Sequence, residues 1–536
     1  MSEIDNRRLQ QSESLLIELF EFCQSESISE DGLREIIEQH DGLREIIERH
    51  GLTTQNLSSF HLGRFRFFHA ACINERVTEG IIRCLLEYFP AAASAVVDDG
   101  WSPLHAACQN PNMAFSIIQL LIDAAPNTVR SVNHKGFMPL HCLCTNRKLD
   151  DKKSIDILKL LIQKHPGAVR HADIQGYLPI HYIACGWGRR SPEFCRVLIE
   201  AYPGSERITA SNGMLPFHFS CMNNTVPTVE YLYGLYPDAI NYTTTDGDYP
   251  IHYAIIGMNN RDNPTGAKEI VEYLLDCDPN VKFQKVNGES LLHITCQWDY
   301  TDSKIHVALE MIKIIYDANP EAIEDDTFAS NIHRYHQQVQ SFLNGELVYS
   351  RQAKNLRQMT TPDDNGRLPL HTALQINVRL GSIKLLVKGN PHALQTHDNS
   401  GTLPLHVACQ HHNSTKVIQY LVGLDTSILD AIDRKGDTAL HYACRGAKYD
   451  NIALLLEKYD AVSVSKRNAH GKLPIDLLWE SNAVEDRESI EYTESVFRLL
   501  TAYPEMMMNY NLDMKQQGTS NRCSTQNGKK RKLYAV

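Results

Sequence analysis

Apolar residues recur at positions i, i+3 and i+4 in a series of short runs along this chain, and Pro follows most of the runs. The run from Ile157 to Ile162 has this spacing, and Pro166 follows it. Pro lacks the backbone N–H that would continue a helix, so each run predicts a core-facing helix that ends before its Pro. These Pro residues are Pro90, Pro126, Pro166, Pro203, Pro237, Pro279, Pro320, Pro391 and Pro504.

A second pattern lies upstream of these helices, in which an apolar residue and His are followed by small residues, as in PLHAAC and PLHVAC. Successive markers are 34 to 41 residues apart, except for one gap of 78 between His293 and His371. A fixed period of this length is the signature of a repeat architecture. The eleven marker residues are His69, His105, His141, His181, His218, His252, His293, His371, His406, His441 and Asp476.

Gly precedes the marker by five residues in ten of the eleven repeats, and in six of these an Asp or Asn lies three residues earlier. Asp173 and Gly176 are one such pair. Asp/Asn-x-x-Gly is typical of a tight turn, because the short side chain bonds to the local backbone and Gly tolerates a positive φ. Each repeat is therefore predicted to contain a turn, a short first helix opening at Pro-Leu-His, a connection and a second helix.

These residues resemble the ankyrin-repeat family, whose repeat reads Asp-x-x-Gly-x-Thr-Pro-Leu-His-x-Ala-Ala and continues into a second helix. The resemblance covers about residues 61–504, and it implies an all-α solenoid of eleven helix–turn–helix repeats with short turn fingers and a concave surface suited to protein recognition. Leu replaces the family's Thr in five repeats, where we expect packing to substitute for the Thr-to-His capping bond. These are Leu178, Leu215, Leu368, Leu403 and Leu473.

Three segments fall outside the regular repeats. Residues 1–60 are predicted to form an N-terminal helical capping segment, in which DGLREIIEQH (31–40) is followed by its near-copy DGLREIIERH (41–50). One straight helix could not keep both apolar stripes on one face, so two short helices are expected. Residues 505–536 form a polar, basic-ended tail.

The third segment accounts for the long marker spacing, because residues 321–362 hold 36 more residues than an ordinary finger. Apolar residues from Ile332 to Leu343 have helical spacing, and Leu347 to Met359 is predicted to form a second helix. We favour a helical insertion at about 325–362, since the turn Gly and Pro-Leu-His are absent there. A degenerate repeat is the alternative, because 36 residues is one repeat length.

Net charge, the length of apolar runs and the placement of Cys exclude several classes of protein. The 53 Lys and Arg against 64 Asp and Glu give a net charge of −11, which argues against a nucleic-acid-binding protein because phosphate neutralisation needs clustered cations. No segment reaches the roughly 18 apolar residues of a membrane helix. The 14 Cys follow the repeat rather than a disulfide framework. We therefore expect a soluble cytoplasmic protein, monomeric, with reduced thiols.

The tail contains four consecutive basic residues, Lys529, Lys530, Arg531 and Lys532. Such a run resembles a nuclear-import signal, which would make the chain a nuclear regulatory ankyrin protein. Basic runs are more often solvated tails, so the cytoplasm stays the preferred location.

His-x-x-Cys occurs seven times, as in His105 and Cys108, and it raises the alternative of a metal- or thiol-dependent enzyme. Structural zinc needs four ligands whereas each repeat supplies two, and a catalytic thiol needs one tuned site rather than seven copies. Leu374 and Ile255 replace the Cys in two otherwise normal repeats. We interpret these Cys as small buried hydrophobes and expect no enzyme, no catalytic residues, no metal and no cofactor.

The position directly after the turn Gly is the candidate binding site. In four consecutive repeats it holds Trp101, Phe137, Tyr177 and Met214, whereas the later repeats carry mostly polar residues there. In ankyrin proteins this position is exposed beside the concave face, and aromatic and Met side chains are enriched at interface cores. The alternative is that these side chains fold back onto neighbouring turns. The sequence thus predicts a non-catalytic scaffold or adaptor that binds another protein.

Overall fold

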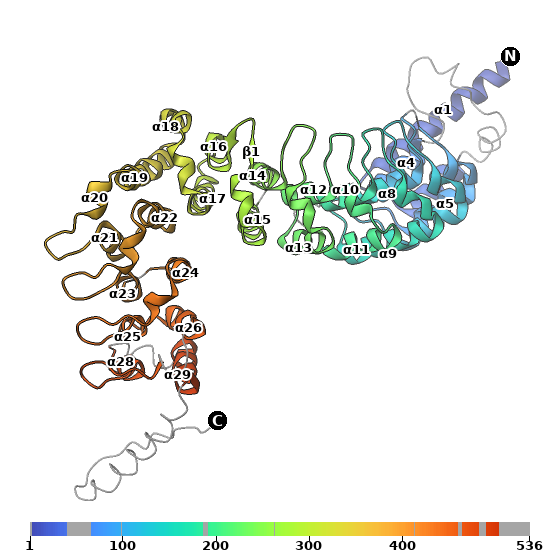
Figure 1. The fold of residues 1–536 in the computed structure, drawn as a ribbon. Coiled ribbons are helices and arrows are strands. Elements are labelled where there is room, and N and C mark those ends of the chain that lie inside the picture. The colour runs from blue at the N-terminus through green and yellow to red at the C-terminus, as the bar shows by residue number, and fades with distance from the viewer. Residues whose placement is uncertain are drawn as a thin grey trace, which may run out of the picture. The chain divides into compact units, whose positions relative to one another are not determined.

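The computed structural model describes residues 3–39, 66–97, 99–185, 191–261, 263–411, 413–458, 464–481 and 489–502, with side chains from residue 14 onward except at 326, 327, 356 and 357. The chain divides into two compact bodies, Met1–Ile314 and Ile315–Val536, which are called the N-terminal body and the C-terminal body below. The described part is mostly helical and has almost no strand, as the repeat pattern predicted (Figure 1).

Seven repeats of the N-terminal body each hold a short first helix and a second helix. The first helices stack in one row and the second helices in another, with the fingers extending beyond the first row (Figure 1). The first helices are α4 (Arg66–Ile73), α6 (Pro103–Gln109), α8 (Pro139–Thr145), α10 (Pro179–Cys185), α12 (Pro216–Asn223), α14 (Pro250–Asn260) and α16 (Leu291–Gln297). The second helices are α5 (Glu79–Tyr88), α7 (Phe115–Ala124), α9 (Asp151–Lys164), α11 (Pro192–Ala201), α13 (Val226–Leu235), α15 (Thr265–Cys277) and α17 (Ile305–Ala318), the last of which ends in the C-terminal body.

The C-terminal body repeats the same design four times. Its first helices are α21 (Pro369–Gln375), α23 (Pro404–Gln410), α25 (Ala439–Arg445) and α28 (Pro474–Glu480). Its second helices are α22 (Leu380–Gly389), α24 (Thr415–Leu424), α26 (Tyr449–Lys458) and α29 (Ile490–Ala502). Buried aliphatic side chains from both rows form one continuous core across these repeats.

The finger turn has the predicted geometry. All ten turn Gly residues have φ between +71° and +84°, a region that disfavours side chains with a Cβ. In the His181 repeat, the Asp173 carboxylate accepts hydrogen bonds from the backbone N–H groups of Gln175 and Tyr177 at 2.8 and 2.9 Å. The His252-to-His293 finger contains a minimal hairpin, β1 (Lys285–Val286) and β2 (Glu289–Ser290), around an Asn-Gly turn.

Second helices end before their Pro, as predicted, and the Pro also begins a new short helix. In most repeats this Pro opens a short 3-10 helix, where its fixed φ suits the first position. These helices are η2 (Pro90–Ser94), η3 (Pro126–Arg130), η4 (Pro166–Arg170), η6 (Pro237–Asn241), η7 (Pro279–Phe283), η8 (Pro320–Glu324) and η10 (Pro391–Gln395), with η5 (Ser205–Arg207) and η11 (Thr426–Leu429) as variants. The Tyr before the Pro also bridges repeats, since the Arg170 guanidinium lies 4.6 Å from the Tyr202 ring centroid.

The N-terminal segment covers the first repeat. Helix α1 (Glu3–Gln24) packs on α4, and α2 (Glu30–Glu38) packs on α5, so the two helices continue the two rows. Helix α2 contains most of the first DGLREIIE copy, with Leu33 and Ile37 buried. The second copy, residues 41–50, lies outside the described residues, as does the tail with Lys529 to Lys532.

At the carboxyl ends of the first helices, side chains of the following repeats donate hydrogen bonds to backbone carbonyls. The Asn110 side-chain amide donates to the carbonyl oxygens of Cys72 and Asn74 at 2.9 and 2.8 Å, and Asn146 does the same to Cys108 and Asn110. These groups satisfy carbonyls that no intrahelical donor reaches. Arg261 and Lys304 play this role for later repeats.

The segment between the two sets of repeats is helical, with α18 (Asp326–Asn331), η9 (Ile332–Arg334), α19 (Gln337–Ala353) and α20 (Leu356–Thr360). The expected second helix at Leu347 to Met359 is wrong in its start, because α19 continues through Leu347 with no helix-breaking Pro to end it. Helix α19 packs along α22, where the buried Glu346 carboxylate accepts a hydrogen bond from the Ser382 hydroxyl.

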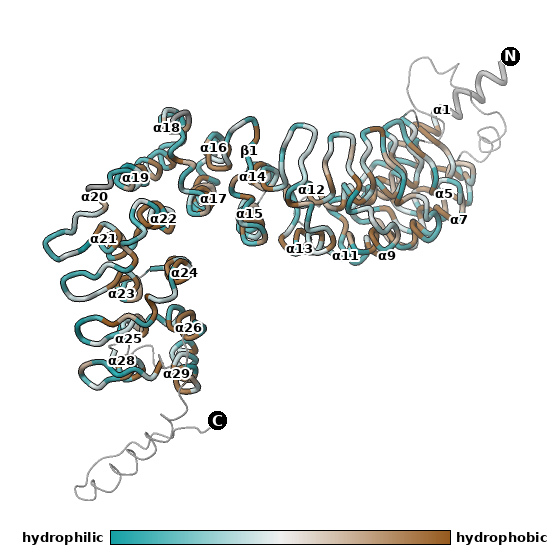
Figure 2. The backbone as a smooth tube through the Cα atoms, viewed as in Figure 1, coloured by the Kyte–Doolittle hydropathy of each residue, from teal (hydrophilic) through white to brown (hydrophobic). Residues whose placement is uncertain are grey.

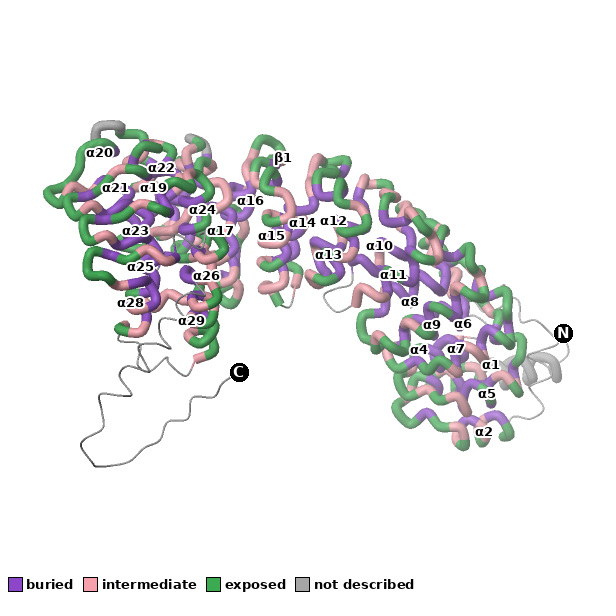
Figure 3. The backbone as a smooth tube through the Cα atoms, turned by 60° about the horizontal axis from the view of Figure 1, so that its bottom comes forward, coloured by how far each residue is buried: buried purple, intermediate pink, exposed green. Residues whose placement is uncertain are grey.

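Hydrophobic residues follow the helices, and polar residues follow the fingers (Figure 2). The buried positions lie along the packed sides of the helices, with exposed positions at the finger tips (Figure 3). Across the described residues, no helix has the length and the apolar character needed to span a bilayer.

Candidate functional site

Most of the marker His residues connect neighbouring repeats. In the His181 repeat, ring Nδ1 accepts from the backbone N–H of Leu178 at 3.0 Å, and Nε2 donates to the carbonyl of Ile208 in the next finger at 3.1 Å. This bonding requires the neutral Nε2–H tautomer. Burial lowers the pKa of His181 to about 4, so the ring stays neutral near pH 7.

The hydrogen bond that caps the first helix is also present in repeats where Leu replaces the family's Thr. Its donor is the backbone N–H of the residue before Pro, and its acceptor is the His ring, so it needs no side-chain hydroxyl. Packing is therefore not the substitute that the sequence led us to expect. In the final repeat, Asp476 accepts the same bond from the N–H of Leu473 at 2.8 Å. A carboxylate can accept at the cap but cannot donate to a next finger.

The Cys of His-x-x-Cys lies in the core. Cys108 and its equivalents Cys72, Cys221, Cys296, Cys409 and Cys444 are about 1 % exposed or less. Burial raises the pKa of the Cys108 thiol far above its ordinary value, which disfavours the thiolate needed by a nucleophile or metal ligand. Within the residues that the structure describes, no three His, Cys, Asp or Glu side chains gather as a metal site would require.

The residue after the turn Gly faces the fourth residue after the marker on the first helix. In three of the four repeats of the C-terminal body these two positions bond to each other: Arg367 to Gln375 at 2.8 Å, Asp437 to Arg445, and Lys472 to Glu480 at 2.5 Å. The last repeat of the N-terminal body has the same pair, in which Gln297 donates to Glu289 at 2.9 Å. In the C-terminal body, both positions line a groove of about 860 Å³ that runs along the fingers and first helices. We call the corresponding surface of either body the finger face.

The N-terminal body carries aromatic side chains at the same positions of its finger face. Trp101, Phe137 and Tyr177 are each partly exposed. Each ring lies against the marker His of its own repeat, with centroids 5.7, 5.5 and 6.0 Å apart. The opposing helix positions hold Gln109, Thr145 and Cys185, so neither of the two positions carries a charged side chain in these three repeats.

Met214 departs from the predicted row. Its side chain is 5 % exposed, so the prediction that it stands on the surface is wrong. An unbranched side chain with three rotatable bonds can fold into a gap between neighbouring turns, which a rigid ring cannot do as readily. The alternative that these side chains fold back is thus correct for Met214 and partly correct for the three rings.

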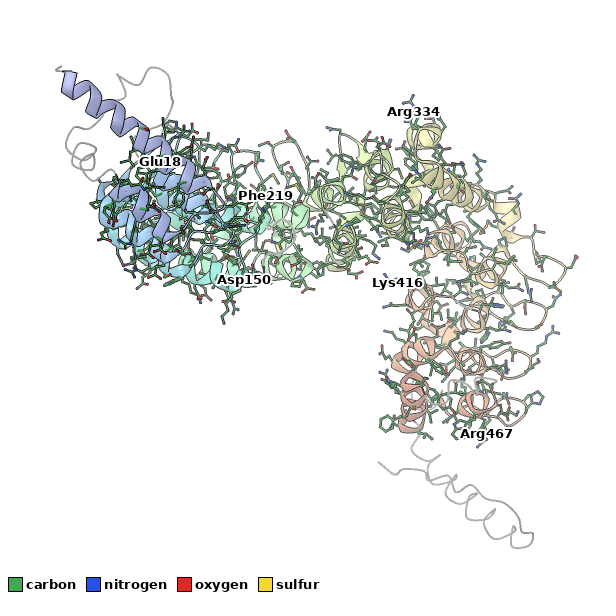
Figure 4. The ribbon with its side chains drawn as sticks, turned by 180° about the vertical axis from the view of Figure 1, so that it is seen from behind. Glu18, Asp150, Phe219, Arg334, Lys416 and Arg467 are labelled. Atoms are coloured by element: carbon green, nitrogen blue, oxygen red, sulfur yellow. The ribbon has the colours of Figure 1, made fainter. Side chains whose placement is uncertain are left out.

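Three aromatic residues that the sequence reading did not select complete the row. Tyr182, Phe219 and Tyr253 directly follow the marker His in three consecutive repeats, and each is partly exposed. Tyr182 bridges Phe137 and Tyr177, with ring centroids at 5.2 and 5.7 Å, and Phe219 contacts Tyr177 at 5.5 Å. Figure 4 labels Phe219 in this stretch. The sequence does contain a signal for these three residues, namely an aromatic residue directly after His in three successive repeats.

Hydrogen bonds fix the polar tips of these rings. The Tyr182 hydroxyl donates to Asp173 at 2.5 Å, and the Asn212 amide donates to the Tyr177 hydroxyl at 3.2 Å. Burial and then the neighbouring Asp173 raise the pKa of both phenols, so both stay protonated at physiological pH. The aromatic row, defined as Trp101, Phe137, Tyr177, Tyr182, Phe219 and Tyr253, is therefore an uncharged and preorganised surface.

Comparison with known families gives a clear class. The family model for ankyrin repeats, in three-copy form, matches residues 67–168, 180–282, 328–430 and 371–468. These matches cover more than half of the chain, so the protein belongs to the ankyrin-repeat family. The third match includes most of the helical segment between the two sets of repeats. A search of curated proteins finds no match.

Proposed function

We propose that this ankyrin-repeat protein is a non-catalytic scaffold that binds a protein partner through the aromatic row of its N-terminal body. Ankyrin repeats are generally protein–protein interaction modules. The observation that carries the proposal is chemical: the finger positions that pair with polar partners in the C-terminal body hold partly exposed rings here. Partly exposed Tyr, Trp and Phe are the residues that most often anchor interfaces.

The shape of the row favours a protein over a small ligand. Its members come from five consecutive repeats, from Trp101 to Tyr253, so it is an elongated surface rather than a pocket. Rings that already contact one another lose little conformational entropy on binding, which increases the affinity available from each contact.

The test is affinity capture from cells that express the protein, with wild type and a Trp101→Ala/Phe137→Ala variant as baits. We expect the specific partner signal to fall at least about tenfold, because a central aromatic anchor typically contributes about 2 kcal/mol. The matched control is Phe115→Ala, which removes an aromatic side chain that is 44 % exposed on the second helix α7.

Thermal unfolding of each bait separates binding from folding. Phe137 contacts His141 and Tyr182, so a modest fall in its thermal midpoint is expected. Equal capture by wild type and the double variant would contradict the proposal. Loss of capture together with general unfolding would mean that the rings are structural. The single variant Trp101→Ala then distinguishes the two roles, because the Trp101 ring lies against the His105 ring of its own repeat.

A further inference from the structure

The groove in the finger face of the C-terminal body has a different chemistry from the aromatic row. It is lined by fingers and first helices of four consecutive repeats and has a volume of about 860 Å³. Five cationic side chains reach it, from Arg367, Arg434, Lys435, Arg445 and Lys472. The chain as a whole is acidic at −11, so this concentration of cations is local.

The acidic residues of the groove are already occupied by the fold. Asp398 is 8 % exposed and accepts from the N–H groups of Ser400 and Thr402, both at 2.8 Å. Asp433 is 7 % exposed, and it accepts from two finger N–H groups and from the Tyr442 hydroxyl at 2.8 Å. Because these carboxylates are covered, little of their charge is presented at the surface.

Among the cations, Arg445 pairs with the buried Asp437, whereas the two at the finger tip are exposed. Arg434 and Lys435 form an exposed finger tip, and neither side chain makes an ion pair with any residue that the structure describes. Arg367 donates to the neutral Gln375, and its nearest acid is the covered Asp398 at 3.7 Å. Of the lining acids, Glu480 is exposed, and it pairs with Lys472.

We propose that this groove is a second binding site, which takes an acidic, extended peptide segment of a partner protein. Carboxylates of such a segment would replace the water around Arg434, Lys435 and Arg367. Exposed side-chain amides of Gln375 and Gln410 supply neutral donors and acceptors for the peptide backbone. Charge complementarity of this kind speeds association and selects the partner.

A peptide fits better than a nucleic acid. Proteins that bind single-stranded nucleic acid combine basic grooves with exposed aromatic platforms on which bases stack. The aromatic residue among those lining this groove is Tyr442, which is 8 % exposed and held by Asp433. The groove therefore offers charge without a stacking surface.

The test uses the full chain and a fluorescein-labelled synthetic peptide of alternating Glu and Ser, measured by fluorescence anisotropy. We expect saturable binding that weakens steeply with NaCl, because screening lengths fall from about 10 Å at 0.1 M to about 3 Å at 1 M. An Arg434→Ala/Lys435→Ala variant should bind about tenfold more weakly, as expected when contacts at an interface are removed.

The control variant is Lys416→Ala/Lys458→Ala, which removes the same charge from exposed sites on the second helices α24 and α26. Figure 4 labels Lys416, which belongs to α24, and Arg467, which belongs to the finger of the last repeat. This control should bind like wild type, and Trp101→Ala should do so too, which keeps this site distinct from the aromatic row. The proposal is overturned if the peptide does not bind, if both double variants lose affinity equally, or if a labelled oligo-dT of equal charge binds as tightly.

Discussion

At the scale of single residues, a buried His lies at the start of the first helix in most repeats, and in seven of the described repeats its Nε2 also bonds to a carbonyl of the next finger. In the His141 and His252 repeats, Nε2 is buried without such a bond. Burial lowers the pKa of His105, His141, His218, His252 and His406 to about 4, as it does for His181. The unfolded chain binds these protons near pH 6.5, whereas the folded chain resists them until about pH 4. Their contribution to stability is therefore complete above pH 6.5 and decreases as the pH falls toward 4.

This predicts acid-sensitive unfolding well before the carboxylates titrate. Between pH 7.5 and pH 5, each such ring should lose on the order of 2 kcal/mol of stabilisation, from its shift in pKa. Urea unfolding followed by circular dichroism at the two pH values measures the effect. A midpoint that is unchanged between them would show that these rings are accessible and do not tie the repeats together.

The turn Gly residues allow a sharper test. A Val in place of Gly176 would combine a φ of +78° with a Cβ only 2.6 Å from the Ser211 hydroxyl oxygen of the next finger. Gly247 has a φ of +83° but nothing within 4 Å of the added Cβ. We expect Gly247→Val to cost about 1–3 kcal/mol from backbone strain alone, and Gly176→Val to cost more.

Hydrogen exchange locates the damage. Faster exchange should stay near the His181 and His218 repeats, because each repeat contacts only its neighbours. Uniformly faster exchange in the whole N-terminal body, or equal costs for the two variants, would refute this account of the fingers.

At the scale of elements, the ends of the first helices depend on side chains from the following repeat. Replacing Asn110, which is 1 % exposed, with Ala would leave the carbonyl of the buried Cys72 without this donor, whereas the carbonyl of Asn74 keeps the backbone N–H of Val77 at 3.1 Å. Buried unsatisfied carbonyls cost about 1–3 kcal/mol each.

Asn110→Ala should therefore lower the thermal midpoint and speed exchange at the end of α4. The exposed Asn112→Ala is the matched control, since its amide reaches the exposed carbonyl of Glu75 at 3.1 Å. Equal effects of both changes would contradict the proposed role of Asn110.

The sequence was sufficient for what depends on local chemistry. Pro, Gly and the Asp-x-x-Gly turn determine backbone geometry within a few residues, so the helices and fingers were placed correctly from the pattern. The Asn110 interaction depends on the preceding repeat, some 35 residues away in the sequence, so a local pattern does not predict it. The burial of Met214 is likewise a result of packing in the folded array. The start of a second helix at Leu347 failed for the opposite reason: no residue there stops α19.

At the scale of the whole molecule, the same repeat fold carries two finger faces with different side chains. Because His, Gly and the core residues carry the folding, the residue after the turn Gly is free to vary among repeats. It is aromatic in three repeats of the N-terminal body, at Trp101, Phe137 and Tyr177, and it is polar and internally paired in the C-terminal body at Arg367 and Lys472. We infer that the two finger faces are specialised for different partner segments.

The most direct test of this account is hydrogen exchange of the full chain with and without the captured partner. Binding through the aromatic row predicts slower exchange in the fingers and first helices at residues 133–145 and 173–185, with the second helices α7 and α9 unchanged. Protection confined to the second helices, or absent from both finger segments, would show that the partner binds elsewhere and that the aromatic row is not the binding site.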